Sequence, residues 1–79
     1  MPQNMHLGLL KKGQKAVVES IEGEALENYL MRVGLVPGDL LELVAEAPFG
    51  DPLAVKVNGV KVAMRRHDAE KVAIQLTEA

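Results

Sequence analysis

The chain has 79 residues, a formal net charge of −2 and no cysteine. This length predicts a single domain over residues 1–79, because a chain of this size has no room for a second core. The lack of cysteine excludes disulfides, thiolate metal sites and cysteine nucleophiles, and it agrees with a cytoplasmic location.

The charge and hydropathy patterns bear on the partners of the chain. Its basic residues are scattered, whereas a nucleic-acid-binding protein normally concentrates them in one field, so we expect no nucleic-acid partner. No apolar run approaches the ~20 residues that cross a bilayer, so we expect no membrane insertion. A composition of 48% hydrophobic and 25% charged residues is typical of a folded chain.

The N-terminal part of the sequence predicts a loose end, an anchor and a strand. Residues 1–4 carry no pattern, and the leucines that follow should pin the chain: Leu7, Leu9 and Leu10. Residues 14–22 are rich in β-branched side chains and predict a strand with Ala16 and Val18 facing inward. Ile21 breaks strict alternation, which predicts a bulge or twist near the end of this strand.

A helix and a tight corner follow. Apolar residues recur at helical spacing and should form one stripe: Leu26, Tyr29, Leu30 and Val33. Gly34 is placed to end this helix in the left-handed conformation. Residues 36–39, Val-Pro-Gly-Asp, predict a tight turn into a new strand.

The second strand is expected over residues 39–47. Leu41 and Leu43 should share its inner face, while Leu40 and Val44 lie on a half-apolar outer face. Residues 47–52 hold two prolines and a glycine, which predicts a loop.

The clearest local signal is a hairpin over residues 53–64. Asn58-Gly59 lies between two alternating apolar runs, and this dipeptide favours the two-residue hairpin turn. The turn fixes three facing pairs on one side of the sheet: Val57 with Val60, Val55 with Val62, and Leu53 with Met64.

The last part of the chain predicts one helical turn and one strand. Asp68 should cap the turn at residues 69–71, and Val72, Ile74 and Leu76 alternate as a strand, with residues 77–79 frayed. The fold class is therefore all-β: five short antiparallel strands that curl into a small barrel, with one short α-helix inserted between the first two.

Few residues are suited to catalysis or metal binding. Ser20 is the only serine and has no histidine near it in sequence, so we expect no enzyme and no cofactor. His67, Asp68 and Glu70 are the best-placed metal ligands, but their spacing matches no defined site. We therefore expect no physiological metal site.

A partner surface is more plausible on residue type. Arg65 and Arg66 could clamp a phosphate or carboxylate, although we favour pairing with Glu42, Glu46 or Asp51. Phe49 either packs over the barrel mouth or stands out as an anchor for another protein. The candidate partner-binding residues are Phe49, Asp51, Leu40, Val44, Arg65 and Arg66.

Several segments together resemble the FeoA-domain family, the small companions of the bacterial ferrous iron transporter FeoB. They are residues 7–13 (LGLLKKG), 16–18 (AVV), 30–38 (LMRVGLVPG), 47–52 (APFGDP), 55–59 (VKVNG) and 62–66 (VAMRR). The sequence departs from the family pattern at Val33, where methionine is usual.

The resemblance implies an SH3-like barrel and a non-enzymatic adaptor. Such an adaptor would bind the cytosolic GTPase portion of a FeoB-type transporter and support Fe²⁺ uptake. The alternative is a metal-sensing domain, like the SH3-like C-terminal domain of iron- and manganese-dependent repressors. The short strand edges also leave room for a homo-oligomer.

Overall fold

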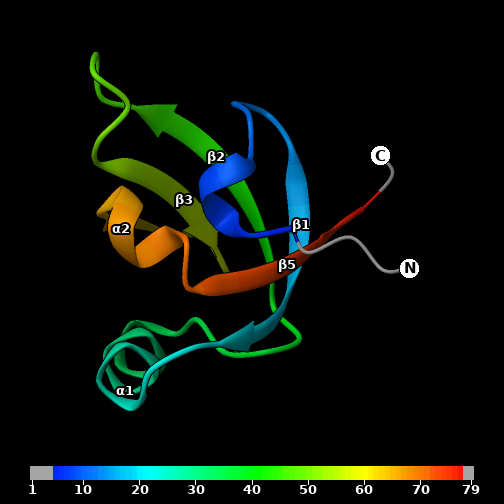
Figure 1. Ribbon diagram of the computed structural model, residues 1–79. Coiled ribbons are helices and arrows are strands. Elements are labelled where there is room, and N and C mark those ends of the chain that lie inside the picture. The colour runs from blue at the N-terminus through cyan, green and yellow to red at the C-terminus, as the bar shows by residue number, and fades with distance from the viewer. Residues whose placement is uncertain (1–4, 78–79) are drawn as a thin grey trace.

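The computed structural model describes residues 5–77, so the expectations for residues 1–4 and 78–79 lie outside the described chain. The described chain forms five strands and three short helical segments. Figure 1 shows how the sheet curls around its interior. In chain order the elements are η1 (Leu7–Leu9), β1 (Lys15–Ile21), α1 (Glu24–Val33), β2 (Leu40–Glu46), β3 (Leu53–Val57), β4 (Val60–Met64), α2 (Arg66–Ala69) and β5 (Val72–Leu76).

All five strands belong to one antiparallel sheet in the order β4-β3-β2-β1-β5. This confirms the predicted all-β class and the single helix inserted between the first two strands. In Figure 1 α1 lies at one end of the curled sheet, and η1 lies inside the curve, beside α2. No helix of the described residues has the length and apolar character to span a membrane.

The β3–β4 hairpin has the predicted register. Leu53 faces Met64, Val55 faces Val62 and Val57 faces Val60. The turn between the strands places Asn58 at φ 52° and Gly59 at φ 80°, the left-handed backbone that an Asn-Gly turn requires.

Two bulges bend the sheet. The pairing of β1 with β5 shifts between Val18 and Ser20, close to the irregularity that Ile21 indicated. A second shift, between Leu43 and Ala45, interrupts the pairing of β2 with β3 and was not expected. It leaves Val44 as the extra residue, so the side chain of Val44 is half buried.

The core is aliphatic and lies inside the curled sheet. Its largest fully buried side chains are Leu7, Leu30, Leu35, Leu41, Leu43, Leu53, Ile74, Val18, Val55, Val57 and Val72. The expected inward residues of β1 and β2 are all among the buried residues.

The prediction that Tyr29 and Leu9 pack into the core is wrong. Tyr29 is 49% exposed, because α1 meets the sheet along a narrow line that buries Leu30 and only partly covers Leu26 and Val33. Leu9 is 51% exposed, because the tight turn of η1 directs Leu7 inward and Leu9 out to solvent.

The end of α1 follows the sequence signal. Gly34 has φ 97°, and the amide of Leu35 donates to the Leu30 carbonyl oxygen at 2.8 Å. Leu35 is fully buried, so the corner closes against the core. The next turn is held by Asp39, whose carboxylate accepts the Val36 amide at 2.9 Å.

The segment before η1 covers part of the outer edge of β5. The Ile74 amide donates to the Met5 carbonyl oxygen at 3.0 Å, and His6 forms a bridge with Ala73. The first and last described segments of the chain therefore lie side by side.

Candidate interaction site

The loop over residues 47–52 presents one aromatic side chain to solvent. Phe49 is 98% exposed, which settles the two placements that the sequence left open: it stands out from the domain. The loop is tied internally, because the Ala47 amide donates to the Pro52 carbonyl oxygen at 3.0 Å and the Gly50 amide donates to that of Ala47 at 2.7 Å. The ring is thus carried on an ordered backbone.

The guanidinium of Arg66 fastens this loop to the rest of the domain. Its Nε donates to the Gly50 carbonyl oxygen at 2.9 Å, and its Nη2 lies 2.8 Å from Glu46 Oε2 at the end of β2. Its Nη1 donates to the carbonyl oxygen of Gly8 in η1. One planar side chain therefore connects three separate segments. Arginine can do this because its guanidinium has five N–H donors that point in different directions.

Asp51 and Arg65 complete the surroundings of the loop. The Asp51 carboxylate accepts the backbone amide of Arg66 at 2.9 Å and lies 3.6 Å from Arg65 Nε. The expected pairing of the two arginines with acidic residues is therefore present, with Glu46 and Asp51 as the partners. The Arg65 side chain is 73% exposed, so it remains accessible to another molecule.

The expected cap of the last helical turn is wrong. Asp68 lies inside α2 and makes no side-chain capping bond at its start. Asp51, which is 15 positions earlier in the chain than Arg66, supplies the acceptor for an amide of the first turn instead. A carboxylate is favourable there because the first amides of a helix have no partner within it.

The structure divides the six candidate partner-binding residues into two groups. Phe49, Asp51, Arg65 and Arg66 lie together around the loop. Leu40 is 51% exposed but begins β2, and six residue steps of ~3.3 Å place it about 20 Å from Glu46. Leu40 therefore does not extend the apolar surface beside Phe49, and Val44 is half buried at the bulge.

The three weak metal-ligand candidates form no cluster. His67 Nδ1 lies 3.8 Å from Asp68 Oδ1, and the His67 side chain is 78% exposed. Over residues 5–77, no group of three or more His, Asp or Glu side chains is arranged to hold a metal ion.

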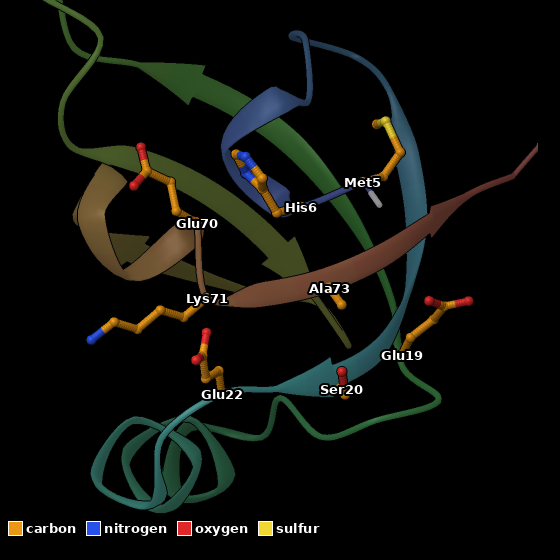
Figure 2. Close-up of a pocket in the computed structure, with 8 residues that line it drawn as sticks. All are labelled: Met5, His6, Glu19, Ser20, Glu22, Glu70, Lys71 and Ala73. Atoms are coloured by element: carbon orange, nitrogen blue, oxygen red, sulfur yellow. The ribbon is translucent and has the colours of Figure 1, made fainter. Parts of the chain in front are cut away.

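A surface hollow of about 270 Å³ is lined by residues that the sequence analysis did not predict to lie close together. Figure 2 shows side chains around it from the N-terminal segment, from β1 and the residue that follows it, from the two residues after α2, and from β5: Met5, His6, Glu19, Ser20, Glu22, Glu70, Lys71 and Ala73. Gly8 lies beside the imidazole, since a β-carbon there would be 3.1 Å from His6 Nδ1 and 3.4 Å from Glu70 Cγ.

His6 and Ser20 line this hollow without forming a nucleophile and base pair. His6 Nδ1 is buried and has no hydrogen-bond partner among the described residues. An activated serine would need a hydrogen bond to its base. Only the fold brings these two residues near each other, because the N-terminal segment pairs with β5 and β5 pairs with β1.

A curled sheet of five antiparallel strands with short helices defines the chain as a small SH3-like β domain, as expected. The family model of the FeoA domain matches residues 5–76. The chain belongs to the FeoA-domain family, which confirms the resemblance seen in the sequence.

Several proteins in ferrous iron transport are similar to this chain. An Fe²⁺ transport protein A/FeoB fusion protein of Porphyromonas gingivalis is 32% identical over 73 residues, which are 91% of this chain and 9% of that protein. The chain thus spans about a tenth of that relative.

Solved structures of FeoA proteins have the same fold. The FeoA protein of Chlorobium tepidum is 40% identical, with a TM-score of 0.89 over 94% of this chain and 71% of that one. FeoA of Stenotrophomonas maltophilia, solved with zinc, is 33% identical, with a TM-score of 0.77 over 90% and 89% of the two chains. A manganese-dependent transcriptional repressor shares the fold alone, at 18% identity, with a TM-score of 0.85 over 98% of this chain and 38% of the repressor.

Proposed function

We propose that this chain is a non-enzymatic cytoplasmic adaptor that docks on the GTPase portion of a FeoB-type transporter and supports Fe²⁺ uptake. The fused relative supports this proposal, because it carries an FeoA region and an FeoB region in one polypeptide. Two domains that act together are often joined in this way, since the linker raises the effective concentration of each for the other.

The observation that carries the proposed mechanism is the exposure of Phe49. A fully exposed phenylalanine gains about 1.5 to 3 kcal/mol when a partner buries it. Phe49 is 98% exposed on a loop that Arg66 already holds in place, so little conformational freedom is lost when the ring docks. We assign Phe49 as the anchor, with Arg65 and Asp51 as the charged rim around it.

A titration of the ¹⁵N-labelled chain with the soluble GTPase domain of the transporter tests this function. We expect NMR shift changes in the amides of residues 48–51 and in Arg65. The Phe49→Ala variant should weaken binding about tenfold or more, because an aromatic anchor at the centre of an interface is worth at least 1.4 kcal/mol.

Met31→Ala is the matched control for this experiment. Met31 is an apolar side chain with 55% exposure, and it lies on α1 rather than on the loop. Its truncation should change the affinity less than twofold. Equal effects of the two variants, or shifts confined to α1, would contradict the proposed face. No shifts at high micromolar GTPase domain would contradict the docking itself.

The alternative proposal is a metal-sensing regulatory domain. Its support is the shared fold with metal-dependent repressors, which at 18% identity shows the architecture and no more. Titration of the chain with Fe²⁺ distinguishes the two proposals. Saturable binding of one ion with micromolar affinity, together with shifts at His67, would favour sensing.

A further inference from the structure

The two edges of the sheet differ in whether another segment of the chain pairs with them. The outer edge of β5 is covered in part, because the Ile74 amide donates to the Met5 carbonyl oxygen and His6 forms a bridge with Ala73. The other edge belongs to β4, and no backbone hydrogen bond from the described residues reaches its outer side. An uncovered edge offers free N–H and C=O groups to another extended chain.

The hairpin register identifies the free groups. In an antiparallel pair, residues alternate between those that bond across the pair and those that point away from it. The two-residue turn makes Val57 and Val60 a bonded pair, so Val62 and Met64 also bond to β3. Lys61 and Ala63 therefore direct their N–H and C=O groups outward, and both residues are exposed.

The side chains on the outer face of the sheet form a charged row that ends at this edge. Lys15 faces Glu42, Glu42 faces Lys56, and Lys56 faces Lys61. The signs along the row are plus, minus, plus and plus. A carboxylate on the next strand would lie directly opposite Lys61 and would relieve its repulsion from Lys56.

The opposite side of β4 is apolar. Val60 is 53% exposed, whereas Val62 and Met64, which share its side of the strand, are 5% and 4% exposed. An added strand would therefore meet valine on one side and lysine on the other. The complementary strand alternates apolar and acidic residues.

The two edge strands of a second copy, within the described residues, do not provide such a strand. β4 has the sequence VKVAM and β5 has the sequence VAIQL, and neither contains an acidic residue. Antiparallel pairing of two β4 strands would place Lys61 opposite Ala63 or opposite another lysine. Lysine on an edge strand opposes pairing between two copies of that edge.

We propose that β4 is a docking edge that accepts an extended acidic segment of another protein as a sixth antiparallel strand. Main-chain hydrogen bonds to Lys61 and Ala63 supply the affinity, and the carboxylate opposite Lys61 supplies the selectivity. The backbone groups of Lys61 and Ala63 are not among the residues assigned around Phe49, and the proposal does not depend on the identity of the transporter partner.

The test uses a synthetic peptide, acetyl-Glu-Val-Glu-Val-Glu-amide, and a matched peptide with lysine in place of glutamate. We expect the acidic peptide to shift the NMR signals of residues 60–64 and to slow hydrogen exchange of the Lys61 and Ala63 amides. The lysine peptide should bind about tenfold more weakly, because an attractive cross-strand pair becomes a repulsive one.

Two variants and one control examine the edge directly. Lys61→Glu should weaken the acidic peptide about tenfold and should favour the lysine peptide. Lys15→Glu makes the same charge change at the far end of the row, three strands away, and should alter the affinity less than twofold. Ala63→Pro removes one outward donor and should abolish binding while the hairpin pairing is kept.

Lys61→Glu keeps the test decisive if Ala63→Pro fails to fold. The proposal is overturned if the acidic peptide does not bind at millimolar concentration, or if Lys61→Glu and Lys15→Glu behave alike. It is also overturned if the peptide shifts residues 48–51 instead of 60–64. Protection of the Lys61 and Ala63 amides in a peptide-free dimer would assign the edge to a second copy.

Discussion

Replacing Arg66 by alanine removes the side chain that joins η1, β2 and the Phe49 loop. Three donor groups of its guanidinium are bonded, to Gly8, Glu46 and Gly50. Hydrogen bonds to charged groups contribute about 1.5 to 3 kcal/mol when buried. Because the Arg66 side chain is 33% exposed, we take about 1 kcal/mol for each bond.

The expected loss is therefore about 3 kcal/mol of unfolding free energy, a large share of the 5 to 15 kcal/mol of a small domain. For a domain of this size it corresponds to a fall of about 15 °C in Tm. Urea unfolding and calorimetry measure both quantities. The variant should also bind the GTPase domain more weakly, because the loop that carries Phe49 loses its attachment.

The neighbouring arginine is the matched control. Arg65 is 73% exposed, and its ion pair with Asp51 has a distance of 3.6 Å. Arg65→Ala should therefore cost less than about 0.5 kcal/mol. Arg66→Lys keeps the positive charge but lacks the several N–H donors of the guanidinium. Its loss of unfolding free energy should therefore lie between those of Arg66→Ala and Arg65→Ala. If Arg66→Ala and Arg65→Ala have the same urea midpoint, the assigned role of Arg66 is wrong.

Three further outcomes follow from the fold and the site. Leu43→Ala should cost about 2 to 5 kcal/mol in a urea melt, because it leaves a cavity at a fully buried position, whereas the exposed Leu40→Ala should cost less than about 0.5 kcal/mol. Gly59→Ala should cost about 1 to 2 kcal/mol in the same assay, because φ at this position is 80°, and an unchanged midpoint would contradict the left-handed turn. Calorimetric titration with Zn²⁺ or Fe²⁺ should show no saturable one-to-one site of micromolar affinity, and His67→Ala should leave the trace unchanged, since the described residues hold no cluster of three ligands.

The hairpin and the helix end could be predicted because their signals are local. Asn58-Gly59 demands a two-residue turn, and that turn fixes every facing pair of β3 and β4. Gly34 similarly ends α1 where its sequence position requires. Such features depend on the backbone torsions of one or two residues, which the residue type restricts strongly.

The candidate site depends on contacts that leave no pattern in the sequence. Arg65 and Arg66 are adjacent and identical in type, yet only Arg66 turns inward, and two of its three partners are backbone carbonyls. The acceptor at the start of α2 comes from Asp51, a residue in another loop, so local capping rules pointed to Asp68 instead. The prediction that Tyr29 is buried was wrong for a related reason. Helical spacing identifies an apolar stripe on α1, but it does not show how much of that stripe the sheet covers.

The pairing of the first and last described segments has a consequence for how the domain can be attached to other polypeptides. The Met5 carbonyl oxygen bonds the Ile74 amide, and the Thr77 amide bonds the Lys15 carbonyl oxygen. In Figure 1 these segments lie on the side of the domain opposite the tip of the loop between β2 and β3. A polypeptide joined near residue 5 or residue 77 would be attached on the side of the domain opposite the Phe49 loop. The Phe49 loop would therefore stay accessible to a partner. A circular permutant that links these segments and opens the chain at the hairpin turn should keep the same sheet.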